Sequence, residues 1–164
     1  MNIKTLEKII NQYKDDILRF ALYRIGSYEN ALDITQNVFI KCFEKNIDFD
    51  QIENPKSYLY KTVFNACIDF NRKSKIETVL IDENQEIATS DKYQHEIYEE
   101  YQRINFMLKD IPTEQAEIVK MRIIDEMSFK EISKITDLQV ATVKSRFKYG
   151  INKLKKFHQN KKEV

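Results

Sequence analysis

The chain has 164 residues, a length that fits one domain or two small ones, each near the lower limit for an independent core. Glycine and proline occur only twice each and 32% of the residues are charged, so the composition favours helices over sheets. The formal net charge of +1 argues against a protein that coats nucleic acid without specificity. We therefore expect an all-α fold made of two small helical domains.

The sequence shows no pattern typical of an enzyme. His95 and His158 lie outside any motif, no glycine-rich phosphate loop is present, and the carboxylates have no metal-ligand spacing. Cys42 and Cys67 lie in apolar helical contexts without CxxC spacing, so we expect buried thiols. We predict no catalytic residues, no metal and no cofactor. The chain begins without an apolar signal region and has no membrane-spanning run, which predicts a cytoplasmic protein.

Apolar residues at helical spacing predict the first two helices. The stripe of the first helix is ended by Gly26, which can adopt a positive φ. The second helix covers about residues 28–45, and on the residues alone its outward face is ordinary polar surface. The first stripe comprises Leu6, Ile10, Tyr13, Ile17, Phe20, Ala21 and Arg24. The second helix has Ala31, Ile34, Val38, Cys42 and Phe43 inward and Asp33, Gln36, Asn37, Lys41 and Glu44 outward.

A third helix is predicted from Pro55 to about Lys73, with proline at its first position. The loop before it, residues 46–54, carries Phe49 as an aromatic available for stacking. The predicted core face of this third helix comprises Leu59, Val63, Phe64, Cys67 and Phe70. Its other face mixes aromatic, amide and basic groups and is either solvated surface or a surface for single strands and base edges. These residues are Tyr58, Lys61, Thr62, Asn65, Asp69 and Arg72.

Residues 74–100 are expected to form an acidic linker between two domains, residues 1–73 and 101–164. Between residues 76 and 100, Lys92 is the one basic residue against eight acids. A helix is expected from about Lys92 to Leu108, and Pro112 opens another that continues through Met127. Those two helices should pack against the segment that follows.

Residues 128–156 predict a helix, a tight turn and a second helix. Ser128 with Glu131 forms a capping box at the first helix, and Asp137 tolerates the left-handed backbone that the turn needs. The second helix should begin near Gln139. Its inner face comprises Val143, Phe147, Ile151 and Leu154, and its outer face Thr142, Ser145, Lys148, Tyr149 and Asn152.

The second helix of this pair is basic. From Thr142 to Lys162 there are eight basic residues and no acidic ones. Lysine and arginine attract phosphate, and small polar residues between them read base edges in a major groove, so we interpret the unit as DNA-binding. The alternative, a solvated face with a lysine-rich tail, fits the tail alone. The basic residues are Lys144, Arg146, Lys148, Lys153, Lys155, Lys156, Lys161 and Lys162.

The order of these elements resembles the extracytoplasmic-function (ECF) group of bacterial RNA polymerase sigma factors, in the sigma-70 family. DITQNVF (33–39) is similar to the polymerase-binding motif of region 2. NPKSYLY (54–60), NACID (65–69) and Arg72-Lys73 are similar to its promoter-melting and minus-10 helix. IPTEQ (111–115), SFKEI (128–132) and ATVKSR (141–146) resemble region 4.

The resemblance implies three groups of site residues and two obligatory partners, core RNA polymerase and promoter DNA. It also allows an anti-sigma factor as a further partner. Core polymerase binding is expected at Asp33, Gln36, Asn37 and Phe39. Minus-10 binding is expected at Phe49, Tyr58, Lys61, Asn65, Asp69, Arg72 and Lys73. Minus-35 binding is expected at Thr142, Lys144, Ser145, Arg146, Lys148 and Tyr149.

Two functions follow as hypotheses. The first is a dissociable sigma factor that directs RNA polymerase to specific promoters. The alternative is a polymerase-independent helix-turn-helix transcriptional regulator, which predicts a sensor or dimerisation module in front of residue 128. A basic, aromatic-bearing helix stands there instead, which favours the sigma factor.

Overall fold

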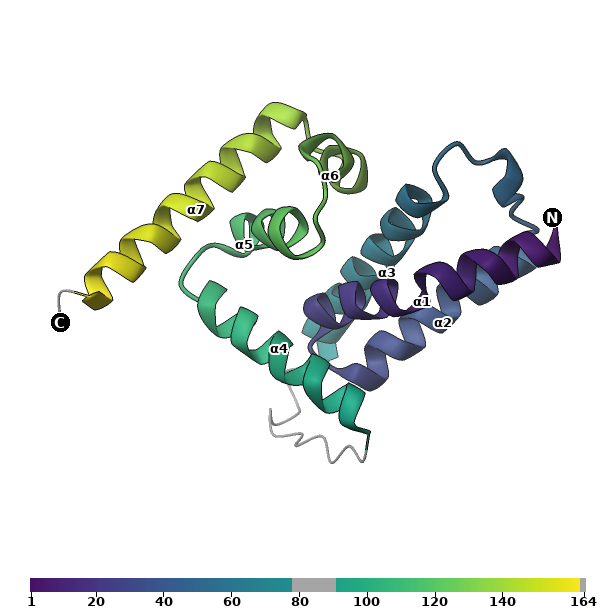
Figure 1. Ribbon diagram of the computed structural model, residues 1–164, viewed down its shortest axis with the longest axis horizontal. Coiled ribbons are helices and arrows are strands. Elements are labelled where there is room, and N and C mark those ends of the chain that lie inside the picture. The colour runs from purple at the N-terminus through teal and green to yellow at the C-terminus, as the bar shows by residue number, and fades with distance from the viewer. Residues whose placement is uncertain (78–90, 163–164) are drawn as a thin grey trace. The chain divides into compact units, whose positions relative to one another are not determined.

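The computed structural model describes residues 1–77 and 91–162, and over these residues the chain is helical without a strand (Figure 1). The predicted all-α fold is thereby confirmed. A short 3-10 helix, η1 (Phe49–Gln51), and a π-helical turn, η2 (Lys120–Ile124), lie between the α-helices. The α-helices are α1 (Ile3–Ile25), α2 (Tyr28–Glu44), α3 (Pro55–Glu77), α4 (Lys92–Leu108), α5 (Thr113–Val119), α6 (Phe129–Thr136) and α7 (Val140–Lys162).

The chain divides into two compact units between Tyr101 and Gln102, which we call unit 1 and unit 2. The division falls within α4, so the first part of this helix belongs to unit 1 and the last part to unit 2. The bounds of α4 match the predicted helix, whereas α3 continues past its predicted end near Lys73. Residues 78–90 of the expected acidic linker lie outside the described residues. The domain boundaries 1–73, 74–100 and 101–164 stay a prediction.

In unit 1, α1 packs against both α2 and α3. The Asn2 side chain accepts a hydrogen bond from the Lys4 N–H at 3.1 Å and caps the start of α1. Gly26 ends α1 with φ 76°, the left-handed conformation predicted for it. Ser27 then caps α2 through the Asn30 N–H at 3.4 Å. The fully buried core includes Ile17, Phe20, Leu22, Leu59, Val63 and Cys67.

The buried side of α2 differs from the prediction at Phe43, and it also includes Thr35 and Phe39. Phe43 was expected to face inward, but 54% of its surface is exposed. The buried stripe is centred on Cys42, and each residue of an α-helix turns about 100° from the one before, which carries Phe43 out of the core. Cys42 and Cys67 are both free and buried, as predicted.

Unit 2 contains the last part of α4 together with α5, α6 and α7. α5 packs against α7, and at Gly150 of α7 an added Cβ atom would lie 2.9 Å from Cγ2 of Val119. Only a residue without a side chain fits there without displacing a neighbour. One hydrophobic cluster of unit 2 comprises Leu108, Ile111, Ala116 and Val119, against which Ile104, Phe147, Ile151 and Leu154 pack. The predicted inner face of the second helix is therefore confirmed.

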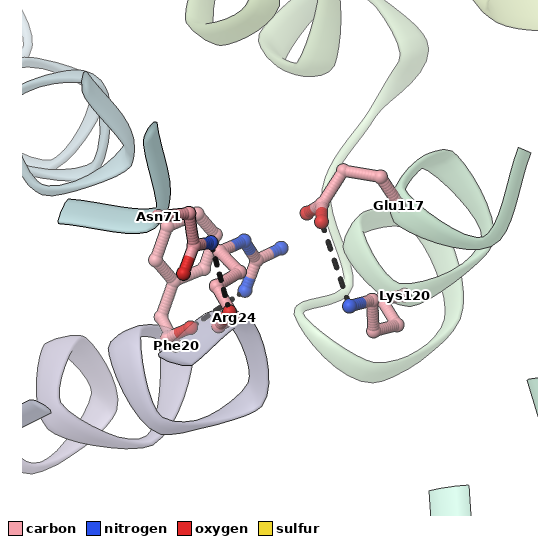
Figure 2. Close-up of polar contacts among 5 residues, drawn as sticks. All are labelled: Phe20, Arg24, Asn71, Glu117 and Lys120. Atoms are coloured by element: carbon pink, nitrogen blue, oxygen red, sulfur yellow. Dashed lines mark hydrogen bonds and ion pairs between the residues drawn. The ribbon is translucent and has the colours of Figure 1, made fainter. Parts of the chain in front are cut away.

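The helix predicted from Pro112 through Met127 is shorter than expected. α5 gives way to the π turn η2, and Glu126 then adopts φ 54°, a left-handed conformation that ends helical geometry. Within this stretch Lys120 Nζ pairs with Glu117 Oε2 at 3.5 Å (Figure 2). The turn brings the chain directly to the cap of α6.

Candidate nucleic-acid interface

Side-chain hydrogen bonds define both the start of α6 and the turn between α6 and α7. Ser128 Oγ accepts from the Glu131 N–H at 3.1 Å, and Glu131 Oε2 accepts from the Ser128 N–H at 2.7 Å, which confirms the capping box. Asp137 ends α6 with φ 57°, as predicted. The Ser133 hydroxyl donates to the carbonyl oxygen of Leu138 inside the turn. The start of α7 is thus positioned by its own local sequence.

The inner face of α7 decides which side chains point outward. Val143 is fully buried, and the ring of Phe147 meets that of Phe129 on α6 edge to face, with centroids 5.4 Å apart. Gly150 then brings α7 directly against α5. Because these contacts fix the rotation of α7 about its axis, the opposite face is presented as one continuous surface.

That opposite face holds the residues predicted to contact minus-35 DNA. Tyr149 is 61% exposed, and α7 contains no acidic residue. Lysine ammonium groups supply phosphate contacts, and hydroxyl groups can hydrogen-bond base edges. The exposed residues of the set are Lys144, Ser145, Lys148 and Tyr149, and Thr142 and Arg146 are half-buried one turn apart on the same side of the helix. The structure therefore brings all six together along one helix.

A second polar face lies on α3. Asp69 and Arg72 form an ion pair of 3.1 Å on the surface, where such pairs contribute little to stability and leave the arginine free to move to another anion. The Thr62 hydroxyl donates to the carbonyl oxygen of Tyr58 at 2.7 Å. Of the residues predicted to contact minus-10 DNA, Asn65, Asp69, Arg72 and Lys73 are exposed and Tyr58 and Lys61 are half-buried.

The position of α3 against α1 is fixed near the ends of both helices. The side-chain amide of Asn71 donates to the carbonyl oxygen of Arg24 at 3.2 Å (Figure 2). Arg24 in turn donates to the carbonyl oxygen of Phe20 at 2.7 Å, and its guanidinium carbon lies 3.4 Å from the centroid of the Phe20 ring. The Asn71 hydrogen bond therefore ties α3 to the end of α1, while the Phe20 contacts hold Arg24 in place within α1.

Phe49 does not occupy the position predicted for it. Its surface is only 4% exposed, so its ring is not available for base stacking. The loop folds back because the Thr5 hydroxyl donates to Asp50 at 3.2 Å and Asp48 caps η1. Burying a phenylalanine ring is favourable by about 2 kcal/mol, which outweighs leaving it in water. Phe49 supports the neighbouring Tyr58 from inside unit 1.

The outward face of α2 contains three of the four residues predicted to bind polymerase. Asp33, Gln36 and Asn37 are exposed. Phe39 is only 8% exposed, because the helical register puts it beside the core stripe, one turn from Thr35. Its ring therefore packs inside unit 1 and has almost no exposed surface with which to contact polymerase.

Three exposed apolar residues on these faces were missed in the sequence. Ile40 is 52% exposed and Phe43 54% exposed on α2, and Ile68 is 47% exposed on α3. A signal for them exists, since Ile40 follows Gln36 by four residues and Ile68 follows Asn65 by three, spacings that share one helix face. Phe43 was expected in the core from the sequence, and no position was predicted for Ile40 or Ile68.

Burial shifts the titration of two side chains beneath the α3 surface. It raises the pKa of the Cys42 thiol, an effect that the nearby Lys45 charge partly opposes. Burial also raises the pKa of the Tyr58 phenol. The negative charge of a Cys42 thiolate would raise this pKa further, and a hydrogen bond with the Thr62 side chain lowers it. Both groups are therefore uncharged near neutral pH, where Tyr58 offers a phenol to a ligand.

Residues 1–77 and 91–162 contain neither a candidate metal site nor a candidate membrane-spanning helix. Over these ranges no cluster of three His, Cys, Asp or Glu side chains is arranged to hold a metal ion. Within the same part of the chain, no helix combines the length and the apolar character needed to cross a membrane.

Comparison with known proteins agrees with this arrangement of two units. The family described as Sigma-70 region 2 matches residues 9–76, and the family described as Sigma-70, region 4 matches residues 101–154. The chain is 29% identical to RNA polymerase sigma factor SigV of Bacillus subtilis over 94% of this chain and 91% of that protein. It is 28% identical to ECF RNA polymerase sigma factor SigW of the same organism, over 90% of this chain and 86% of that one.

Solved structures share the fold. The sigma factor RpoE from Bartonella quintana, solved with the anti-sigma factor NepR, superposes with a TM-score of 0.71 at 19% identity, covering 95% of this chain and 98% of that chain. CnrH, solved with the cytosolic domain of CnrY, superposes with a TM-score of 0.69 at 16% identity, covering 97% and 90%.

The fold and the two matched regions define a transcription initiation factor of the sigma-70 family. Within that family, the chain belongs to the extracytoplasmic-function sigma factors.

Proposed function

We propose that this sigma factor is a dissociable subunit that directs RNA polymerase to specific promoters. In the proposed mechanism the outward face of α2 docks on the core enzyme, the polar face of α3 reads and opens the minus-10 element, and α7 reads the minus-35 element. The protein itself carries out no chemistry, and it acts in the cytoplasm, where polymerase and promoter DNA meet.

The outer face of α7 is the observation that carries this proposal. It presents Lys144, Ser145, Lys148 and Tyr149 on a helix whose rotation is fixed by Phe147 against Phe129. Such a helix can enter a major groove with its small polar groups at base edges and its lysines at phosphates. The exposed Asn65 on α3 adds a side-chain amide that can both donate to and accept from a base.

The polymerase-independent regulator is less well supported. That function needs a sensor or dimerisation module before the helix-turn-helix, and the Sigma-70 region 2 match occupies residues 9–76 instead. A net charge of +1 also gives little general attraction to DNA, so the free chain should bind duplex weakly until polymerase adds its own contacts.

Run-off transcription tests the proposal directly. Purified core polymerase is supplied with a genomic fragment library, with and without the chain. We expect discrete transcripts that need both proteins, and weak duplex binding by the chain alone. Tight, sequence-specific binding by the free chain at physiological salt, without stimulated transcription, would support the regulator instead.

We also propose a protein partner for unit 2, of the anti-sigma kind found with RpoE from Bartonella quintana. A groove of about 630 Å³ lies between the end of α4 and the second half of α7, and its apolar floor is bordered by lysines. Amide hydrogen exchange in residues 151–162 should slow when such a partner binds. Unchanged exchange would show that the partner does not bind in this groove. The groove is lined by Phe106, Met107, Ile151, Leu154, Phe157, Lys155, Lys161 and Lys162, among others.

A further inference from the structure

Two large apolar side chains lie exposed in the polar outward face of α2. Ile40 has 52% of its surface exposed and Phe43 54%. The opposite side of the helix packs on α1 and α3 and already buries Ala31, Val38 and Cys42. Ile40 and Phe43 therefore contribute little to the core of unit 1.

Helical spacing places Ile40 at the centre of the outward face. Gln36, Ile40 and Phe43 follow one another at intervals of four and three residues, which puts them on one ridge. A second row on the same face consists of Asp33, Asn37, Ile40 and Glu44, which are also spaced three or four residues apart. Ile40 belongs to both rows, so the exposed polar groups surround it.

An apolar centre with a polar rim is the usual anatomy of a protein interface. Single exposed apolar residues are common on protein surfaces and need no explanation. Two adjacent apolar residues inside a ring of amide and carboxylate groups are less common. In protein interfaces a few central apolar residues carry most of the binding energy, while the polar rim excludes water. Ile40 and Phe43 have this arrangement, with Asp33, Gln36 and Glu44 at the rim.

We propose that Ile40 and Phe43 are the anchor residues of the polymerase-docking surface, inserting into an apolar recess of the core enzyme while Asp33 and Gln36 hydrogen-bond at its edge. The inference rests on the proposed function of α2. It assigns the binding energy to residues outside the polar set and gives Asp33 and Gln36 the role of orienting the partner. The recess should present apolar side chains to Ile40 and hydrogen-bond donors to Asp33.

Substitution of the anchors separates this role from folding. Ile40→Ser and Phe43→Ser should each weaken binding to purified core polymerase about tenfold, and the double variant about a hundredfold. The thermal melting curve should stay close to that of the unaltered protein. Ile40→Val and Phe43→Leu, which keep apolar side chains, should retain most of the binding and exclude a general loss of structure. Ile3→Ser is the matched control, since Ile3 is an exposed isoleucine, 64% exposed, on α1.

The outcomes distinguish this inference from the proposed function. If the unaltered chain fails to bind core polymerase, the proposed function itself is wrong. If it binds, and alanine at Asp33 and Gln36 weakens binding while serine at Ile40 and Phe43 does not, only the anchor assignment is overturned. Sedimentation of the free chain tests a second copy as the occupant, and a dimer that the serine variants dissociate would also overturn the inference.

Discussion

The rings of Phe49 and Tyr58 meet edge to face, with centroids 5.9 Å apart and an interplanar angle of 83°. Phe49 comes from η1 and Tyr58 from the first turn of α3, so this contact ties the loop to the helix that carries the predicted minus-10 face. Because Phe49 is buried, its ring limits the positions that Tyr58 can adopt. Tyr58 remains half-buried, so part of its ring stays exposed at the surface of α3.

Removing the Phe49 ring should destabilise unit 1. Phe49→Ala creates a cavity in the core and should lower the free energy of unfolding by about 3 kcal/mol. Phe43→Ala is the matched control, because Phe43 is 54% exposed and its loss should change stability by less than about 0.5 kcal/mol. Urea unfolding followed by far-UV circular dichroism measures both, and equal losses in the two variants would contradict the burial of Phe49.

Asp33 and Gln36 should matter for polymerase docking and not for folding. Both are exposed and one turn apart on α2, so a double alanine variant should melt within a degree or two of the unaltered protein. Its affinity for core polymerase should fall, because hydrogen bonds at the edge of the interface are lost. Calorimetry and a binding titration with core enzyme test the two statements. A variant that unfolds early would show that these residues are structural.

The two DNA surfaces should act at different stages of initiation. Lys148→Ala removes an exposed ammonium group from α7, so it should weaken binding to minus-35 duplex and lower the salt dependence of that binding by a slope of about 1. Asn65→Ala on α3 should leave the closed complex intact and reduce promoter opening, measured as permanganate-reactive thymines near the start site.

A premelted bubble template provides the control for this pair. It should partly restore transcription by Asn65→Ala, because the strand is already open, and should leave the Lys148→Ala defect in place. Normal melting by Asn65→Ala, or the same response of both variants to the bubble, would contradict the assignment of separate roles to α3 and α7.

Gly150 should be the most size-sensitive position in α7. Gly150→Leu introduces a side chain where even a Cβ atom would be 2.9 Å from Val119, so the variant should lose about 2 kcal/mol or more of stability in unit 2. Lys153→Leu, three residues further on at an exposed position, controls for the added leucine and should change stability little. Chemical unfolding of both variants decides the point, and a stable Gly150→Leu protein would refute the close approach of α5 and α7.

Alkaline pH should destabilise unit 1 in part through Cys42. Burial raises the pKa of this thiol above its ordinary value of 9.0, so the fold favours the neutral form. The resulting stabilisation is complete below pH 9.0 and is lost as the pH rises through the folded-state pKa. Cys42→Val cannot ionise and should lose less stability between about pH 8 and pH 10.5. Parallel denaturant titrations at both pH values test this, and identical losses would rule out the thiol.

Local signals were sufficient for much of this protein. The capping box of Ser128 and Glu131, the left-handed Asp137 and the terminal Gly26 each depend on residues close together in the chain. Such interactions are complete within one turn of helix, so the sequence alone determines them. The stripe of Val143, Phe147, Ile151 and Leu154 likewise follows from helical spacing, and it determines which face of α7 stays exposed.

Tertiary packing decided what local signals could not. Phe39 and Phe43 lie at the edge of the buried stripe of α2, and the packing of α1 and α3 against α2 sets how far that stripe extends, so that Phe39 is buried and Phe43 is exposed. Phe49 lies in a polar loop whose local sequence predicts exposure, yet its contact with Tyr58 and the Thr5 to Asp50 hydrogen bond turn it inward. Burial is a property of the neighbours that distant segments supply, so it is determined only when those segments meet.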